Sequence, residues 1–347
     1  MDTLKLATEY PPADEQRHID SLIRELGDKM ARDYAKAKTL RDAHPKMHGC
    51  VRGEFAIASN LPAELGIGVF SQSRTYPVWV RFSNQSGTVS ADSKPDIRGV
   101  AIKLMGVDGR KLTPDGDRDL NHDFILISDS RFVTKDVAEF DGLVRGLVSG
   151  NLQILWFFVT HLRVARNLLV SLRRFGNPLR IRYFSVVSYL FGERAAKYAL
   201  TPRNVTDTPV PSNPSDDYLR EAMAEQLGSQ PAVFDFAVQF QTDADKMPIE
   251  DPGITWDEAL SPFRNVATLT IPPQVFDTPA QREFGDNLSF NPWRALPEHR
   301  PLGGISRARR QVYEALSILR HQRNQVPRME PSVTDKEWTN GFPAKER

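Results

Sequence analysis

Short runs rich in β-branched and aromatic residues, separated by Pro, Gly, Asn and Asp, recur along the chain and predict β-strands. They are VRGEFAIAS (51–59), GVFSQS (68–73), YPVWVRFS (76–83), GVAIKLM (99–105), DFILIS (123–128), AVFDFAVQFQ (232–241) and NVATLTIP (265–272). Strands at this spacing indicate an antiparallel sheet or barrel. Together with the helices described next, they place the chain in the α+β class.

Helical spacing of apolar residues marks the two ends of the chain. Ile19, Leu22, Ile23 and Leu26 predict one amphipathic helix over 13–43, within an N-terminal arm of residues 1–43. A second helix is expected at 306–324, at the end of a main domain of residues 44–325. The polar, Pro-containing tail of residues 326–347 is expected to be poorly ordered.

Residues 136–230 interrupt the strands and predict a mostly helical insertion, which ends in the linker TPVPSNPSDD (208–217) and a helix at 218–227. Between residues 142 and 192 there are seven arginines and no acid, around the apolar block ILWFFV (154–159). We favour packing of Trp156, Phe157 and Phe158 on the core, with the arginines facing water or cofactor carboxylates. The alternative, peripheral membrane contact through 145–182, stays open.

Composition narrows the classes of protein. The 347 residues carry a net charge of +1, so nothing global favours nucleic acid as a partner. Cys50 is the only cysteine, which excludes an intrachain disulfide and any four-cysteine metal site. The acidic, Pro-containing N-terminus lacks the pattern of a secretory signal, and charged residues interrupt the apolar stretch 152–172. We therefore expect a cytoplasmic protein without a membrane-spanning helix.

The C-terminal helix carries the first candidate for chemistry. Arg309, Tyr313 and Arg320 are spaced i, i+4 and i+11, so they lie within about 40° of one another around the helix axis. A phenol becomes a metal ligand when its anion is stabilised, and a guanidinium one turn away provides that stabilisation. Tyrosinate is a known type of haem ligand. An ordinary surface helix with solvated arginines would show the same spacing.

The strand YPVWVRFS adds a second, independent sign. Alternation places two sets of side chains on opposite faces: Trp79, Arg81 and Ser83 on one, and Val78, Val80 and Phe82 on the other. A cation and a hydroxyl on one strand face are unusual in a core and are typical of a surface beside a polar cofactor.

Three segments together resemble the catalase family: HPKMHGCVRGEF (44–55), PVWVRFSNQSGTVSADSKPDIRGVAIKL (77–104) and RRQVYEALSILR (309–320). The middle segment is the most specific, because Arg-Phe-Ser is followed by Ala-Asp and then by Asp-x-Arg-Gly-x-Ala-x-Lys. The segment 284–309 resembles the short, catalase-related branch of that family. The resemblance covers about residues 40–325 and implies haem b enclosed by an antiparallel β-barrel.

The resemblance also implies a role for each matching residue. Tyr313 would be the proximal iron ligand, with Arg309 stabilising its phenolate. Arg81 and Arg320 would pair with the haem propionates, and Phe140 would pack on the porphyrin. His48 would be the distal base, oriented by Ser83, and would move a proton between the two peroxide oxygens. Met47 would narrow the access channel.

One position departs from the family pattern. Catalases place an asparagine before a Pro-x-Phe to hydrogen-bond the peroxide, and alignment of DFILISDSRF puts Ser128 there. Asn121 lies seven residues earlier and is the other candidate. A serine hydroxyl is shorter than an amide and free to rotate, so we expect weak catalase activity.

The leading hypothesis is therefore a haem peroxidase related to catalase, acting on hydrogen peroxide or organic hydroperoxides. One alternative is a lipid hydroperoxide isomerase or lyase on the same scaffold. Another is a haem-binding protein without turnover. A homo-oligomer is compatible with each of these hypotheses.

Overall fold

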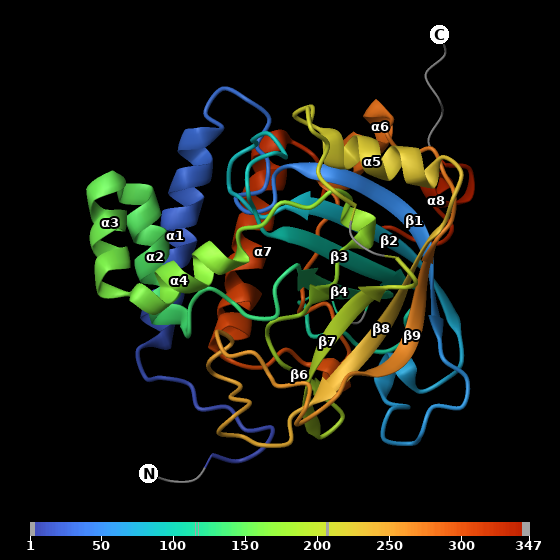
Figure 1. The fold of residues 1–347 in the computed structure, drawn as a ribbon, viewed down its shortest axis with the longest axis horizontal. Helices are drawn as coiled ribbons and strands as arrows, with labels where there is room; N and C mark the ends of the chain where they lie inside the picture. Colours follow the sequence, from blue (N-terminus) through green and yellow to red (C-terminus); the bar gives the residue numbers. More distant parts are fainter. Residues whose placement is uncertain (1–3, 115, 117, 206–207, 342–347) are drawn as a thin grey trace.

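The computed structural model describes residues 4–114, 116, 118–205 and 208–341, and its centre is a closed antiparallel β-barrel (Figure 1). Neighbouring strands follow the order β5-β4-β3-β2-β1-β9-β8-β7-β6, and pairing of β5 with β7 closes the ring. The strands are β1 (Met47–Ile57), β2 (Thr75–Asn84), β3 (Arg98–Met105), β4 (Asn121–Ile127), β5 (Tyr183–Phe184), β6 (Tyr189–Phe191), β7 (Arg194–Pro202), β8 (Ala232–Phe240) and β9 (Arg264–Ile271). The fold is of the α+β class, as the sequence predicts.

The two faces of β2 are divided as the alternation predicts. Val78, Val80 and Phe82 belong to the main core inside the barrel. Trp79 belongs to a separate outer cluster with Met47, Cys50, Met105 and Leu288. Aromatic rings fill the interior, with the rings of Phe124 and Phe236 centred 4.8 Å apart. The outer face of β2, which carries Arg81 and Ser83, is therefore available to a site outside the barrel core.

Helices cover that outer face and one side of the molecule. They are α1 (Glu15–Asp33), α2 (Val137–Ser149), α3 (Asn151–Thr160), α4 (Leu162–Ser171), α5 (Tyr218–Leu227), α6 (Pro279–Asn287), α7 (Gly304–Asn324) and α8 (Lys336–Thr339). The N-terminal helix α1 buries its apolar face and contacts α2 and α7, while α3 and α4 lie outermost (Figure 1). Among the described helices none alone could cross a bilayer; α3 and α4 together have the length and composition, with a bend of 104° between them.

Two expectations about secondary structure are wrong. The run GVFSQS forms a 3-10 turn at Gly68–Phe70, because Gly68 has a φ of +56° and the next N–H donates to the His299 ring. The second half of the predicted helical insertion contains the short strands β5 and β6 and the longer β7. β5 and β6 are too short to show alternation, and β7 is buried on both faces over most of its length, so it lacks the alternation that identifies a strand from sequence.

The expected disordered tail is ordered over most of its length. Glu330 accepts from Lys103 Nζ at 2.8 Å and also pairs with Arg294, and both cations are buried. Trp338 of α8 packs edge-on against Trp79, with ring centres 5.7 Å apart. Residues 326–341 thus cover the outer face of the barrel, and residues 342–347 lie outside the described part.

Candidate functional site

The predicted pair on the C-terminal helix is present. The guanidinium of Arg309 donates two hydrogen bonds to the phenol oxygen of Tyr313, from Nε at 3.2 Å and from Nη2 at 2.9 Å. The helix places them one turn apart, and α7 packs this face toward the interior of the molecule. Burial alone would lower the pKa of Arg309, but the Tyr313 and Tyr189 hydroxyls beside it raise the pKa above its ordinary value. Arg309 therefore stays charged and is directed at the phenol.

Ser83 contacts a different histidine from the one that the sequence predicts. Its Oγ lies 3.0 Å from Nδ1 of His44, in the loop before β1. The ring approaches so closely because residue 99, opposite Ser83 on β3, is a glycine: a Cβ there would lie 2.5 Å from the ring. His44 itself has a left-handed φ of +61°, a conformation that non-glycine residues rarely adopt and that concentrates at functional sites.

His48 lies elsewhere. Its Nε2 is 2.7 Å from Oδ1 of Asn84, and Nδ1 is 3.8 Å from the carboxylate of Asp92. The expected His48–Ser83 pair is absent from the described structure because β1 has a register shift between Met47 and Gly49, which turns His48 away. Burial first, and then the nearby Arg98, lower the pKa of His48 to about 3.

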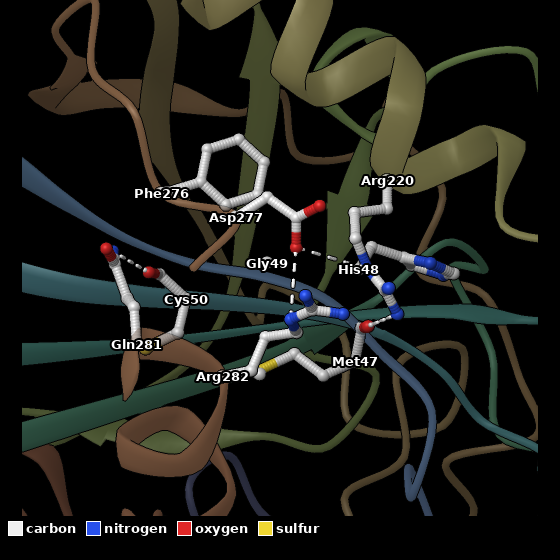
Figure 2. Close-up of a pocket in the computed structure, with 9 residues that line it drawn as sticks. All are labelled: Met47, His48, Gly49, Cys50, Arg220, Phe276, Asp277, Gln281 and Arg282. Carbon is white, nitrogen blue, oxygen red and sulfur yellow. Dashed lines mark hydrogen bonds and ion pairs between the residues drawn. The ribbon is translucent and has the colours of Figure 1, made fainter. Parts of the chain in front are cut away.

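Figure 2 shows the surroundings of His48, a small pocket against α5 and α6. Arg220 of α5 donates to the Met47 carbonyl at 3.2 Å, and Gln281 of α6 donates to the Cys50 carbonyl at 2.7 Å. Side chains of both helices are thus hydrogen-bonded to the backbone of β1 beside His48. This pocket lies at a packed junction between β1, α5 and α6.

His44 and the Arg309–Tyr313 pair belong to one region. Burial and then the charges of Arg81, Arg309 and Arg41 lower the pKa of His44 to about 3. Arg309 therefore acts on His44 through its charge and also bonds Tyr313. Arg41, His44 and Arg309 are each half-buried. The His44 ring is neutral at physiological pH.

Three guanidiniums adjoin this region: Arg81 and Arg320 are buried, and Arg41 is half-buried. Arg81 donates to the His44 carbonyl at 2.9 Å, and its Nε has no partner. Arg41 and Arg320 both donate to the backbone carbonyl of Leu288. Burial and mutual repulsion lower the pKa of Arg81 to about 9 and of Arg320 to about 8. In the described part of the chain, none of the three forms an ion pair with a carboxylate within 4.0 Å.

This charge arrangement fits an anionic group. Buried cations without a counter-ion are costly, and two carboxylates placed among these guanidiniums would remove that cost. Asp286 is the only acid that acts on all three in the described structure. Its carboxylate forms no ion pair with any of them, although Arg320 donates to the Asp286 backbone carbonyl. The donors present therefore fit an anionic group with two carboxylates at one edge.

The other predicted residues are not brought to His44. The hydroxyl of Ser128 accepts from the backbone N–H of Arg98 at 2.9 Å. Asn121 donates to the Pro331 carbonyl at 3.1 Å, near the opposite end of β4. Met47 lies in the outer cluster beneath α6, and Phe140 of α2 packs against Phe132, with ring centres 5.5 Å apart. No amide donor contacts the His44 ring among the described side chains.

Sequence reasoning missed His44 and Arg41, which stand three residues apart in RDAHPK. A signal was available in the strand pattern, since β1 and β2 are antiparallel neighbours and Ser83 stands at the end of β2. A partner for Ser83 had to come from the start of β1 or the loop before it. The choice between His44 and His48 depended on a bulge that no local pattern reveals.

No family model matches the sequence, and no curated protein matches it. Solved structures do. A bacterial catalase matches with a TM-score of 0.61 and 16% identity over 93% of this chain and 64% of that one. A fungal catalase matches with a TM-score of 0.62 and 16% identity, over 95% of this chain and 66% of that one. Catalase A from Saccharomyces cerevisiae matches with a TM-score of 0.66 and 18% identity, over 93% of this chain and 69% of that one. The chain thus spans about two thirds of the length of these catalases, and it has the catalase fold.

Proposed function

We propose that the protein binds haem b, with Tyr313 as the ligand of the iron. Arg309 would stabilise the phenolate through its two N–H donors, and Arg41, Arg81 and Arg320 would hold the two propionates. The observation that carries this proposal is the Arg309–Tyr313 pair together with three guanidiniums, two of them buried, that lack carboxylate partners in the described structure. When bound, haem would supply the iron and the electrons that break the O–O bond of a peroxide.

His44, rather than His48, would move the proton. Its neutral ring, held by Ser83 at Nδ1, can accept a proton from the peroxide and return it to the departing oxygen, which leaves as water from hydrogen peroxide or as an alcohol from an organic hydroperoxide. Arg81 would fix the backbone of His44 through its carbonyl. The reaction class is reduction of hydrogen peroxide or an organic hydroperoxide by a donor.

Oxygen release from hydrogen peroxide should be slow. A well-placed donor that holds a reacting oxygen contributes roughly 10²–10³ in rate, and neither Ser128 nor Asn121 faces His44. We therefore propose a peroxidase with weak catalase activity.

The test is haem reconstitution of the full chain and of Tyr313→Phe, followed by visible spectroscopy and gel filtration. Wild type should retain haem at one per chain, and the variant should lose it while its circular dichroism stays unchanged. Tyr76→Phe is the matched control, because Tyr76 also has an arginine over its ring, with Arg74 4.7 Å from its centre. Equal haem retention and identical spectra in all three proteins would refute Tyr313 as the ligand.

A further inference from the structure

The outermost helices, α3 and α4, carry several large apolar side chains that face solvent. Leu152 is 83% exposed, Trp156 69%, Leu162 72% and Leu169 73%. Leu155 and Val159 complete what we call the α3–α4 face. Large apolar side chains gathered in this way are uncommon on soluble proteins and mark a surface that contacts something else. Trp156 is thus not packed on the core, contrary to the expectation from sequence.

The face is not the result of a loosely attached hairpin. The other side of α3 packs Phe157, Phe158 and Ile154 against the core. The His161 ring stacks on Phe157 at 4.1 Å between centres, and Arg163 of α4 forms a two-pronged ion pair with Asp251, at 2.6 and 2.8 Å. The hairpin is therefore fixed to the body, and α3 is apolar both toward the core and toward solvent.

Positive charge borders the apolar surface. Arg166 follows Leu162 by four residues and precedes Leu169 by three, so all three share one side of α4. Arg173 and Arg174 follow directly and are exposed. None of these three arginines pairs with a carboxylate among the described residues, and the sequence from 142 to 192 contains no acid. The α3–α4 face is apolar at its centre and cationic at its α4 edge.

We propose that the α3–α4 face docks on the surface of an anionic phospholipid bilayer. Trp156 and its leucine neighbours would enter the boundary between headgroups and acyl chains, and Arg166, Arg173 and Arg174 would contact lipid phosphates. The apolar centre of the face matches acyl chains, and the arginines at its α4 edge match the charge of anionic headgroups. Docking of this kind goes beyond the proposed peroxide chemistry and does not depend on it.

The test is flotation of the full chain with vesicles of phosphatidylcholine alone or with 30% phosphatidylglycerol. Binding should require the anionic lipid and should weaken in 0.5 M salt, where the screening length is about 4 Å. Trp156 is the most exposed of the five tryptophans, so brominated lipid should quench its fluorescence and Trp156→Phe should abolish that quenching. Absence of binding to anionic vesicles would refute the proposal.

Variants separate the two components of the surface. Trp156→Ser with Leu152→Ser should abolish binding, whereas the matched change Val275→Ser, at an 81% exposed valine outside the face, should leave it intact. Arg166→Gln and Arg173→Gln should each weaken binding about fivefold. Equal loss in the Val275 variant would overturn the proposal. So would light scattering that shows a dimer dispersed by the Trp156 change, which would assign the face to a second copy.

Discussion

Ser83 Oγ lies 3.0 Å from Nδ1 of His44, although the two residues are 39 positions apart. Ser83 stands at the end of β2, and His44 precedes the neighbouring strand β1. The contact fixes the orientation of a ring whose backbone is already held in a left-handed conformation and whose carbonyl accepts from Arg81. A neutral imidazole held from both sides is suited to accept and return a proton at one defined place.

Glutamine substitutions at His44 and His48 should show which of the two histidines moves the proton. In the haem-loaded protein, His44→Gln should lower peroxide turnover by about 10²–10⁴-fold, the usual contribution of a positioned acid–base group. His48→Gln should leave the rate within about tenfold, because His48 bonds Asn84 and lies in the junction between β1, α5 and α6. Stopped-flow mixing with peroxide and an organic donor measures both. The opposite order of effects would return the role of base to His48.

Removal of the Arg81 guanidinium should maintain or raise the stability of the apoprotein and lower its affinity for haem. Arg81→Leu replaces a buried charge without a carboxylate partner, so the free energy of unfolding should stay equal or rise by about 1–2 kcal/mol. Haem affinity should fall at least about tenfold through loss of a charged hydrogen bond. Calorimetry and haem titration measure the two quantities.

Arg98→Leu is the control for that experiment. Arg98 is equally buried but bonds Asn84 and the Asp92 carbonyl, so its loss should destabilise the protein by about 3 kcal/mol. Similar destabilisation by both changes would mean that Arg81 serves the fold and not an anionic ligand.

Mild acid should destabilise the apoprotein. The pKa values of His48 and His299 are lowered to about 3 and about 4, chiefly by burial, and that of buried His122 lies well below its ordinary value. Between pH 6.5 and 5 the unfolded chain therefore binds protons that the folded chain does not. Each histidine should lower the free energy of unfolding by up to about 1.4 kcal/mol per pH unit as the pH falls.

Urea titrations at pH 7, 6 and 5 measure this dependence. His48→Gln should reduce the slope by the contribution of one proton. A free energy of unfolding that stays constant over this interval would show that these rings take up protons in the folded state.

The C-terminal tail should be held by Glu330. Glu330→Gln leaves the buried Lys103 and Arg294 with only Asp123 and Asp119, so it should destabilise the protein by about 1–3 kcal/mol and open the tail to proteases. Glu337→Gln, an exposed acid of the same tail, is the control. Thermal unfolding and limited proteolysis measure the effect, and identical behaviour of the two variants would contradict the anchoring role.

The local periodicity of the sequence determined much of the secondary structure of this protein. The strand runs that became β1–β4, β8 and β9, the two faces of β2 and the Arg309–Tyr313 spacing are all readable from the sequence, because each depends on residues within a few positions of one another. The helix at 218–227 was likewise predicted from its linker and its apolar spacing.

Only the tertiary structure decided the features that depend on distant partners. The register shift in β1 placed His44 beside Ser83, and closure of the barrel made strands of β5 to β7. Phe157 packs in the core, whereas Trp156 is exposed to solvent. The buried cations Lys103 and Arg294 bind Glu330 and so hold a tail whose composition predicts disorder. Each outcome is set by what packs against a residue, and that information is absent from the segment that contains it.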